Sequence, residues 1–139
     1  MKKKKEKELP EDRKRCFIIG DDTFKQDIMF CLNMTKEEAL CRLKRVNKSL
    51  PIKDEEYILH DDKAESVNAT VYPLSLGFLV VAKWPKDSFR RNVGVIAHEI
   101  VHISYYILKG INTPLEDNTQ EVYAYLTENI LYKFLMKMY

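Results

Sequence analysis

The sequence predicts a small α+β domain, in which a short and mostly antiparallel sheet packs against two C-terminal helices. Short apolar runs separated by turn residues fill the first two thirds of the chain, and helical periodicity fills the last third. A chain of 139 residues is long enough for one compact domain but not comfortably for two. We therefore expect a single domain over residues 16–139, preceded by a basic, flexible tail over residues 1–15.

The charge of the chain is concentrated in this tail. Residues 1–15 hold eight Lys or Arg and four Asp or Glu, whereas the whole chain has a net charge of only +2. We expect the tail to be a solvated end, with a contact to phosphate groups or to a membrane surface as the alternative. Because the total charge is so small, nucleic acid is not expected to be the main partner.

Neither a secretory signal nor a membrane span is expected. The acidic residues between Glu6 and Asp12 interrupt the charged start, and no apolar run approaches the ~18 residues that a bilayer requires. The three cysteines, Cys16, Cys31 and Cys41, are widely spaced and suit a reducing compartment. We read them as ordinary apolar residues and expect a cytoplasmic protein, while nothing in the sequence indicates its oligomeric state.

The elements before the last third are mainly strands. A capping box at Thr35-Lys36-Glu37-Glu38 opens a helix to about Val46, with Leu40, Leu43 and Val46 on one face. The run at residues 77–82 is almost wholly apolar, as in a strand that is buried on both faces. Strands are expected at residues 16–20, 27–32, 57–60, 67–72 and 77–82, with a turn at residues 20–22 and breaks at Pro73 and Pro85.

Two helices are expected to complete the chain. The first runs from about residue 88 to residue 108 and ends at Lys109-Gly110, where Gly110 is suited to a left-handed conformation. The second opens near Asp117 or Asn118 and buries Leu126, Ile130 and Phe134.

The first of these helices carries the run His98-Glu99-Ile100-Val101-His102, which includes two of the three histidines in the chain. Residues four apart on a helix differ by only about 40° around its axis, so both imidazoles can bind one zinc ion. Glu99 lies about 100° further round, where it can act as a general base instead of a ligand. Outside this run no charged residue occurs between Arg91 and Lys109, which predicts a largely buried helix and disfavours an incidental pattern on a solvated face.

A catalytic zinc site needs a third protein ligand. The best candidate is Glu121, which follows His102 after 18 residues and lies on the next helix, beside the small Ala124. Glu116 in the connecting loop is the rival, and His60 is a more distant possibility.

These residues resemble a known family. The segment 95–102 looks like the active-site helix of zincin metallopeptidases, and Glu121 at this spacing is similar to the gluzincin clan. The short chain also resembles small zincin-like peptidases encoded by phages and prophages. The resemblance implies a zinc-dependent metallopeptidase with a peptide or protein substrate, in a small zincin-like fold.

The resemblance also implies roles for individual residues. His98, His102 and Glu121 would bind Zn²⁺, Glu99 would be the base, and the strand at residues 77–82 would be the sheet edge that aligns an extended substrate. The oxyanion would be stabilised by Tyr125, ahead of Tyr105 and His60.

The chain departs from the family pattern at several positions. Tyr105 and Leu108 replace the Gly and His of metzincins, which excludes that class. Tyr125 stands where thermolysin-like enzymes have an Asp, so Asp117 or Glu128 would have to orient a ligand histidine. The alternative is a non-catalytic zincin-fold module for metal binding or protein interaction, because 139 residues leave little room for a substrate cleft.

Overall fold

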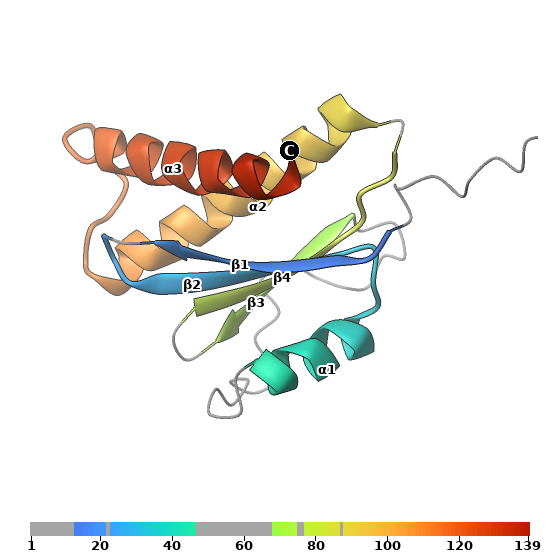
Figure 1. The fold of residues 1–139 in the computed structure, drawn as a ribbon. Coiled ribbons are helices and arrows are strands. Elements are labelled where there is room, and N and C mark those ends of the chain that lie inside the picture. The colour runs from blue at the N-terminus through green and yellow to red at the C-terminus, as the bar shows by residue number, and fades with distance from the viewer. Residues whose placement is uncertain (1–12, 22, 47–67, 75–76, 87) are drawn as a thin grey trace, which may run out of the picture.

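The computed structural model describes residues 13–21, 23–46, 68–74, 77–86 and 88–139. In this part of the chain the elements follow in the order β1 (Arg15–Asp21), β2 (Gln26–Leu32), α1 (Lys36–Val46), β3 (Ala69–Leu74), β4 (Gly77–Ala82), α2 (Phe89–Gly110) and α3 (Gln120–Met138) (Figure 1). The α+β class is confirmed.

The four strands form one mixed sheet in the order β1-β2-β4-β3. The pairs β1–β2 and β3–β4 are antiparallel, whereas β2 and β4 are parallel. The sheet is therefore mostly antiparallel, as expected, with one parallel pairing at its centre.

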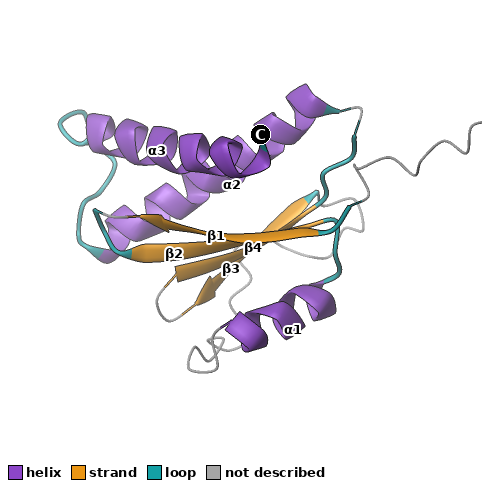
Figure 2. Ribbon diagram, viewed as in Figure 1, coloured by secondary structure: helices purple, strands orange, loops and turns teal. Residues whose placement is uncertain are grey.

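Helices cover both faces of the sheet. The α2–α3 pair packs on one face and α1 on the other (Figure 2). The larger core lies under α2 and α3, where the ring centroid of Phe134 is 4.8 Å from that of Phe30 and 5.4 Å from that of Trp84. A smaller core under α1 contains Cys31 and Leu43, among others. None of the described helices has an apolar stretch long enough to cross a bilayer.

The capping box of α1 is confirmed. The Glu38 backbone N–H donates to Thr35 Oγ1 at 3.2 Å, and Glu38 Oε1 accepts from the Thr35 N–H at 3.4 Å. Ala39 and Leu43 are buried, but Val46 is 58% exposed, so the buried part of this face does not extend to Val46. Val46 is the last residue of the helix, and Ala39 takes its place on the buried face.

Two predictions about the sheet edge are wrong. The strand at residues 77–82 is β4, which lies between β2 and β3 instead of at the edge. Its apolar sequence reflects this internal position, since both faces of the strand are covered.

Pro73 does not end the preceding strand but lies within β3, which has a strand neighbour on one side only among the described residues. Proline is tolerated there because an edge strand need not donate from every N–H.

The end of α2 also differs from the prediction. Gly110 belongs to the last helical turn, and Asn112 adopts the left-handed conformation instead, with φ 57°. The Thr113 N–H donates to the Leu108 carbonyl at 2.9 Å and closes the turn. After glycine, asparagine takes the left-handed conformation most readily. The left-handed residue that ends the helix is therefore Asn112, two positions after the predicted Gly110. The predicted strand at residues 57–60 lies outside the described residues.

We predict that Gly77→Ala destabilises the protein. A Cβ at this position would lie 1.9 Å from the backbone oxygen of Asp27, its partner in the parallel β2–β4 ladder. Backbone cannot rotate away from such a clash, so the loss in the free energy of unfolding should be about 2 kcal/mol or more. Chemical denaturation followed by circular dichroism measures it.

Gly94→Ala is the matched control. Gly94 lies inside α2, and apart from its chain neighbours and the nearby helix backbone no described atom comes within 4 Å of a Cβ built there. The substitution should stabilise the protein by about 0.5–1 kcal/mol, because glycine is a poor helix former. Equal effects at the two glycines would contradict the close approach of β2 and β4.

Candidate metal centre

The packing of α2 determines which way its polar side chains face. Four isoleucines, Ile96, Ile100, Ile103 and Ile107, are buried in the larger core. On another side of the helix, Ser104 Oγ accepts a hydrogen bond from Thr127 Oγ1 of α3 at 2.9 Å. Together these contacts define a face of α2 toward the sheet and a face toward α3.

The two histidines of α2 are brought together. Their Nε2 atoms are 3.1 Å apart, and their ring centroids are 4.8 Å apart. His98 is exposed and His102 is half-buried. Two Nε2 ligands at ~2.05 Å from one tetrahedral zinc ion would be roughly 3.3 Å apart, so this pair fits two ligand positions of one ion.

Glu99 lies on the same helix but in a different environment. It is only 5% exposed, whereas His98 beside it faces solvent. Burial removes water from the carboxylate and raises the pKa of Glu99 to about 7. A carboxyl group with this pKa can accept or release a proton near neutral pH.

The expectation of a largely buried helix is only partly correct. Eight residues of α2 are buried, but Val101 is 54% exposed and Tyr105 is 40% exposed. The absence of charge reflects an apolar outer face rather than complete burial.

The histidines face away from α3. At about 100° per residue, His98 and His102 lie roughly 120–160° around α2 from Ser104, which contacts α3. Val95 occupies the same side one turn earlier, and it lines a cavity of about 70 Å³ with Asn68 and Lys83, which flank β3 and β4. By the same count His98 and His102 lie roughly 130–170° from the middle of the isoleucine face, so the candidate metal side is on the outer side of α2, and only its margin at Val95 reaches the residues that flank β3 and β4.

Glu121 is not placed with the histidines. It is exposed in the first turn of α3, six residues before Thr127. Because α2 and α3 run in opposite directions, this step leads toward the end of α2, while His98 and His102 lie the other way from Ser104. In the described part of the chain no three His, Cys, Asp or Glu side chains are grouped to hold a metal. Glu121 as third ligand thus stays a prediction.

The other described residues suggested as ligands or as partners of a ligand histidine are not placed beside the histidine pair either. Glu116 is exposed in the α2–α3 loop, and Asp117 and Glu128 are also exposed. His60 lies outside the described residues. Their suggested roles therefore stay predictions.

Tyr125 and Tyr105 are placed very differently. Tyr125 is 66% exposed and lines a cavity of about 460 Å³ with Asp21 and Lys133, on the β1 side of α3. This side is about 160° from Thr127 around α3, so it faces away from the histidines. Tyr105 lies on α2 three residues after His102, on its outer face. Of the two phenols, Tyr105 is nearer to the histidine pair in the fold.

Comparison of the chain with protein-family models, with curated proteins and with solved structures found no match.

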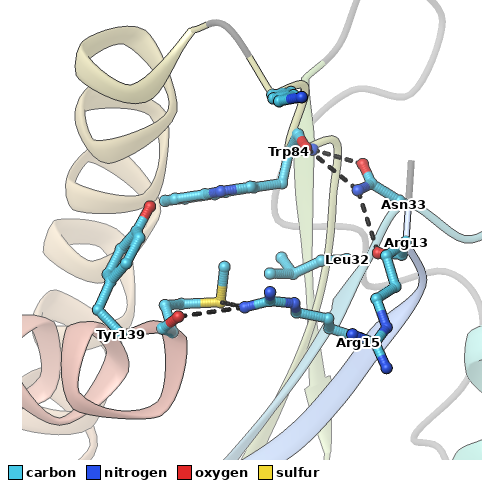
Figure 3. A pocket seen from close by; sticks show the side chains of 8 residues that line it. Arg13, Arg15, Leu32, Asn33, Trp84 and Tyr139 are labelled. Carbon is cyan, nitrogen blue, oxygen red and sulfur yellow. Dashed lines mark hydrogen bonds between the residues drawn. The ribbon is translucent and has the colours of Figure 1, made fainter. Parts of the chain in front are cut away.

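A second concave site was not expected from the sequence. A pocket of about 180 Å³ lies between the start of β1 and the end of α3 (Figure 3). Arg13, Arg15 and Lys86 line it, and Trp84 and Tyr139 form aromatic walls. Its lining comes from four separate segments of the chain, so no local sequence pattern indicates it.

Hydrogen bonds tie the segments around this pocket together. Asn33 Oδ1 accepts from the Trp84 N–H at 2.7 Å, and Arg15 Nη1 donates to the Met138 carbonyl at 3.2 Å. Cationic and aromatic side chains without a lining carboxylate among the described residues suit anion binding. The described lining includes no histidine or side-chain carboxylate that would bind zinc, so the candidate metal chemistry remains at α2.

We predict a pH-dependent cost of burying Glu99 in the metal-free protein. Burial raises the pKa of Glu99 in the folded state to about 7. Below about pH 4.5 the carboxyl is protonated in both the folded and the unfolded protein, and the free energy of unfolding is at its highest. As the pH rises toward 7, only the unfolded protein ionises freely, so the free energy of unfolding falls. At about 1.4 kcal/mol per pH unit, wild type should lose about 3 kcal/mol relative to Glu99→Gln over this range. Urea unfolding of both proteins with a chelator present measures the difference.

Glu37→Gln is the control, because Glu37 is exposed on α1. Its stability difference from wild type should stay within about 0.5 kcal/mol at every pH. A Glu99→Gln difference that does not change with pH would show that Glu99 is not desolvated.

Proposed function

We propose that this chain is a zinc-dependent hydrolase that cleaves peptide bonds, with His98 and His102 as ligands and Glu99 as general base. The observation that carries the proposal is the 3.1 Å separation of the two Nε2 atoms beside a buried carboxylate on the same helix. Neutral imidazoles and carboxylates are the ligands that catalytic zinc sites use.

Each side chain has a separate task. Zinc would supply Lewis acidity toward the scissile carbonyl and toward a water molecule. The Glu99 carboxylate would take a proton from that water and then deliver it to the leaving amine. Because burial already raises the basicity of Glu99, the carboxylate would carry this proton readily at neutral pH.

A third ligand has to join the two histidines to complete the zinc site. We keep Glu121 as the candidate, because a carboxylate completes the usual two-histidine set. Its exposed position in the first turn of α3 requires a change at that helix end when metal binds.

The substrate class follows from the sheet edge. The Val95 margin of the histidine side lies near the start of β3, and the side of β3 away from β4 has no strand neighbour among the described residues. An extended peptide can add to such an edge through main-chain hydrogen bonds. We propose that β3, instead of the strand at residues 77–82, aligns a peptide or protein substrate, with Tyr105 as the candidate oxyanion donor.

A non-catalytic module is the second candidate. Val101 and Tyr105 leave apolar surface exposed beside the histidines, and no three-ligand group exists among the described residues. A surface of this kind suits a partner whose side chains complete the metal site.

We predict that the protein binds one zinc ion through the α2 histidines. His98→Ala and His102→Ala should each lower the affinity by about 100-fold or more, since each removes one ligand. Glu99→Gln and Tyr105→Phe should retain the metal. Competition with a chromophoric chelator measures the affinities, and wild type without stoichiometric zinc would refute the site.

The same titration tests Glu121. A loss in Glu121→Gln comparable to that in His102→Ala would identify it as the third ligand. An unchanged affinity would assign this position to another group.

We predict that Glu99→Gln lowers peptide hydrolysis by about 100-fold to 10,000-fold while keeping zinc, because only the base is removed. Mass spectrometry of a peptide library digested by the zinc-loaded protein measures cleavage. Glu37→Gln, on the opposite side of the sheet, is the control with full activity. A zinc-loaded wild type that cleaves no peptide would favour the non-catalytic module.

A further inference from the structure

Two cysteines lie directly opposite each other on neighbouring strands. Cys16 of β1 and Cys31 of β2 are register partners in the antiparallel ladder. Their Sγ atoms are 3.4 Å apart and share a hydrogen bond. Both thiols are free, so the contact joins two reduced side chains on the α1 side of the sheet.

The two thiols have unequal access to solvent. Cys31 is completely buried, whereas Cys16 is half-buried at the margin of the smaller core. A small polar reagent can therefore reach Cys16 before it reaches Cys31. The third cysteine, Cys41, is exposed on α1 and has no place in this pair.

The electrostatic environment also distinguishes the two. The hydrogen bond from Cys31, helped by the positive charge of Arg42, outweighs the opposing effect of burial, and together they lower the pKa of the Cys16 thiol to about 7. The same hydrogen bond and burial raise the pKa of Cys31. Cys16 is thus the nucleophilic member of the pair, since the thiolate is the reactive form.

We infer that Cys16 and Cys31 form a peroxide-reactive dithiol, in which Cys16 is oxidised first and Cys31 resolves it to a disulfide across β1 and β2. The inference is independent of the proposed zinc chemistry, because the pair lies on the face of the sheet opposite α2.

A peroxide would supply the two-electron oxidation that joins the two thiols. The Cys16 thiolate attacks one peroxide oxygen, the O–O bond breaks, and Cys16 becomes a sulfenic acid while hydroxide leaves. Cys31 sulfur then attacks the Cys16 sulfur, the S–O bond breaks, and the Cys31 proton leaves with the hydroxyl group as water. Two thiols are oxidised and one peroxide is reduced.

The backbone geometry permits this bond. Opposed residues in an antiparallel pair have Cα atoms about 4.5–5.5 Å apart, which lies within the disulfide range of 4.4–6.8 Å. The sulfurs must close from 3.4 Å to about 2.05 Å, a change that side-chain rotation can supply. The described residues offer no third ligand beside the pair, which argues against a metal site there.

The test is oxidation of the reduced, full-length protein with hydrogen peroxide in the presence of a chelator. Free thiols are counted by alkylation under denaturing conditions, and peptide mapping identifies the crosslink. We expect two of three thiols to be lost, one peptide pair joining residues 16 and 31, and recovery with dithiothreitol. The melting temperature should rise by about 5–10 °C on oxidation, because the bond restricts the unfolded chain.

Three variants make the result specific. Cys41→Ser should still lose two thiols, whereas Cys31→Ser should accumulate a sulfenic acid at Cys16 that dimedone traps. In Cys16→Ser, which alters only the half-buried partner, Cys31 should stay reduced, and this variant keeps the test decisive if Cys31→Ser does not fold. Three remaining thiols in wild type, or a crosslink that includes Cys41, would overturn the inference.

Discussion

The structure depends on how α2 packs against both the sheet and its neighbour α3. Its isoleucines occupy one side of the helix, and the Ser104–Thr127 contact occupies another. The remaining side carries His98 and His102, so the histidine pair faces neither the sheet nor α3. The position of a candidate metal is therefore a consequence of core packing, because rotating the helix to turn the histidines toward α3 would expose the isoleucines to water.

This constraint explains what was predictable from the sequence. Thr35 and Glu38 mark the start of α1 through a local hydrogen-bond pattern, and the run at residues 77–82 marks β4 through its apolar composition. The shared face of His98 and His102 needs only helical geometry. In each case the signal lies within a few residues of the feature that it predicts.

Features that depend on distant parts of the chain were not predictable in the same way. The place of β4 inside the sheet results from a parallel pairing with β2, which no local pattern encodes. The location of Glu121 depends on where α3 begins beside α2, and α3 begins at Gln120 instead of near Asp117 or Asn118. Cys16 and Cys31 were read as ordinary apolar residues because 14 residues separate them, and only the β1–β2 register brings them together. Sequence spacing was therefore enough to predict that His98 and His102 lie together, but not to predict where Glu121 lies relative to them.

The parallel β2–β4 pairing has a consequence for the order in which the chain folds. β1 and β2 are joined by four residues, and β3 and β4 by two, so both pairs can form early from local contacts. β2 and β4 are separated by 44 residues that include α1 and β3. Closing this long loop costs chain entropy. The hydrogen bonds of the central ladder and the apolar contacts beneath α2 offset that cost only after the loop has closed. We therefore expect two preformed hairpins to meet in a later step, in which the seam between β2 and β4 limits the folding rate.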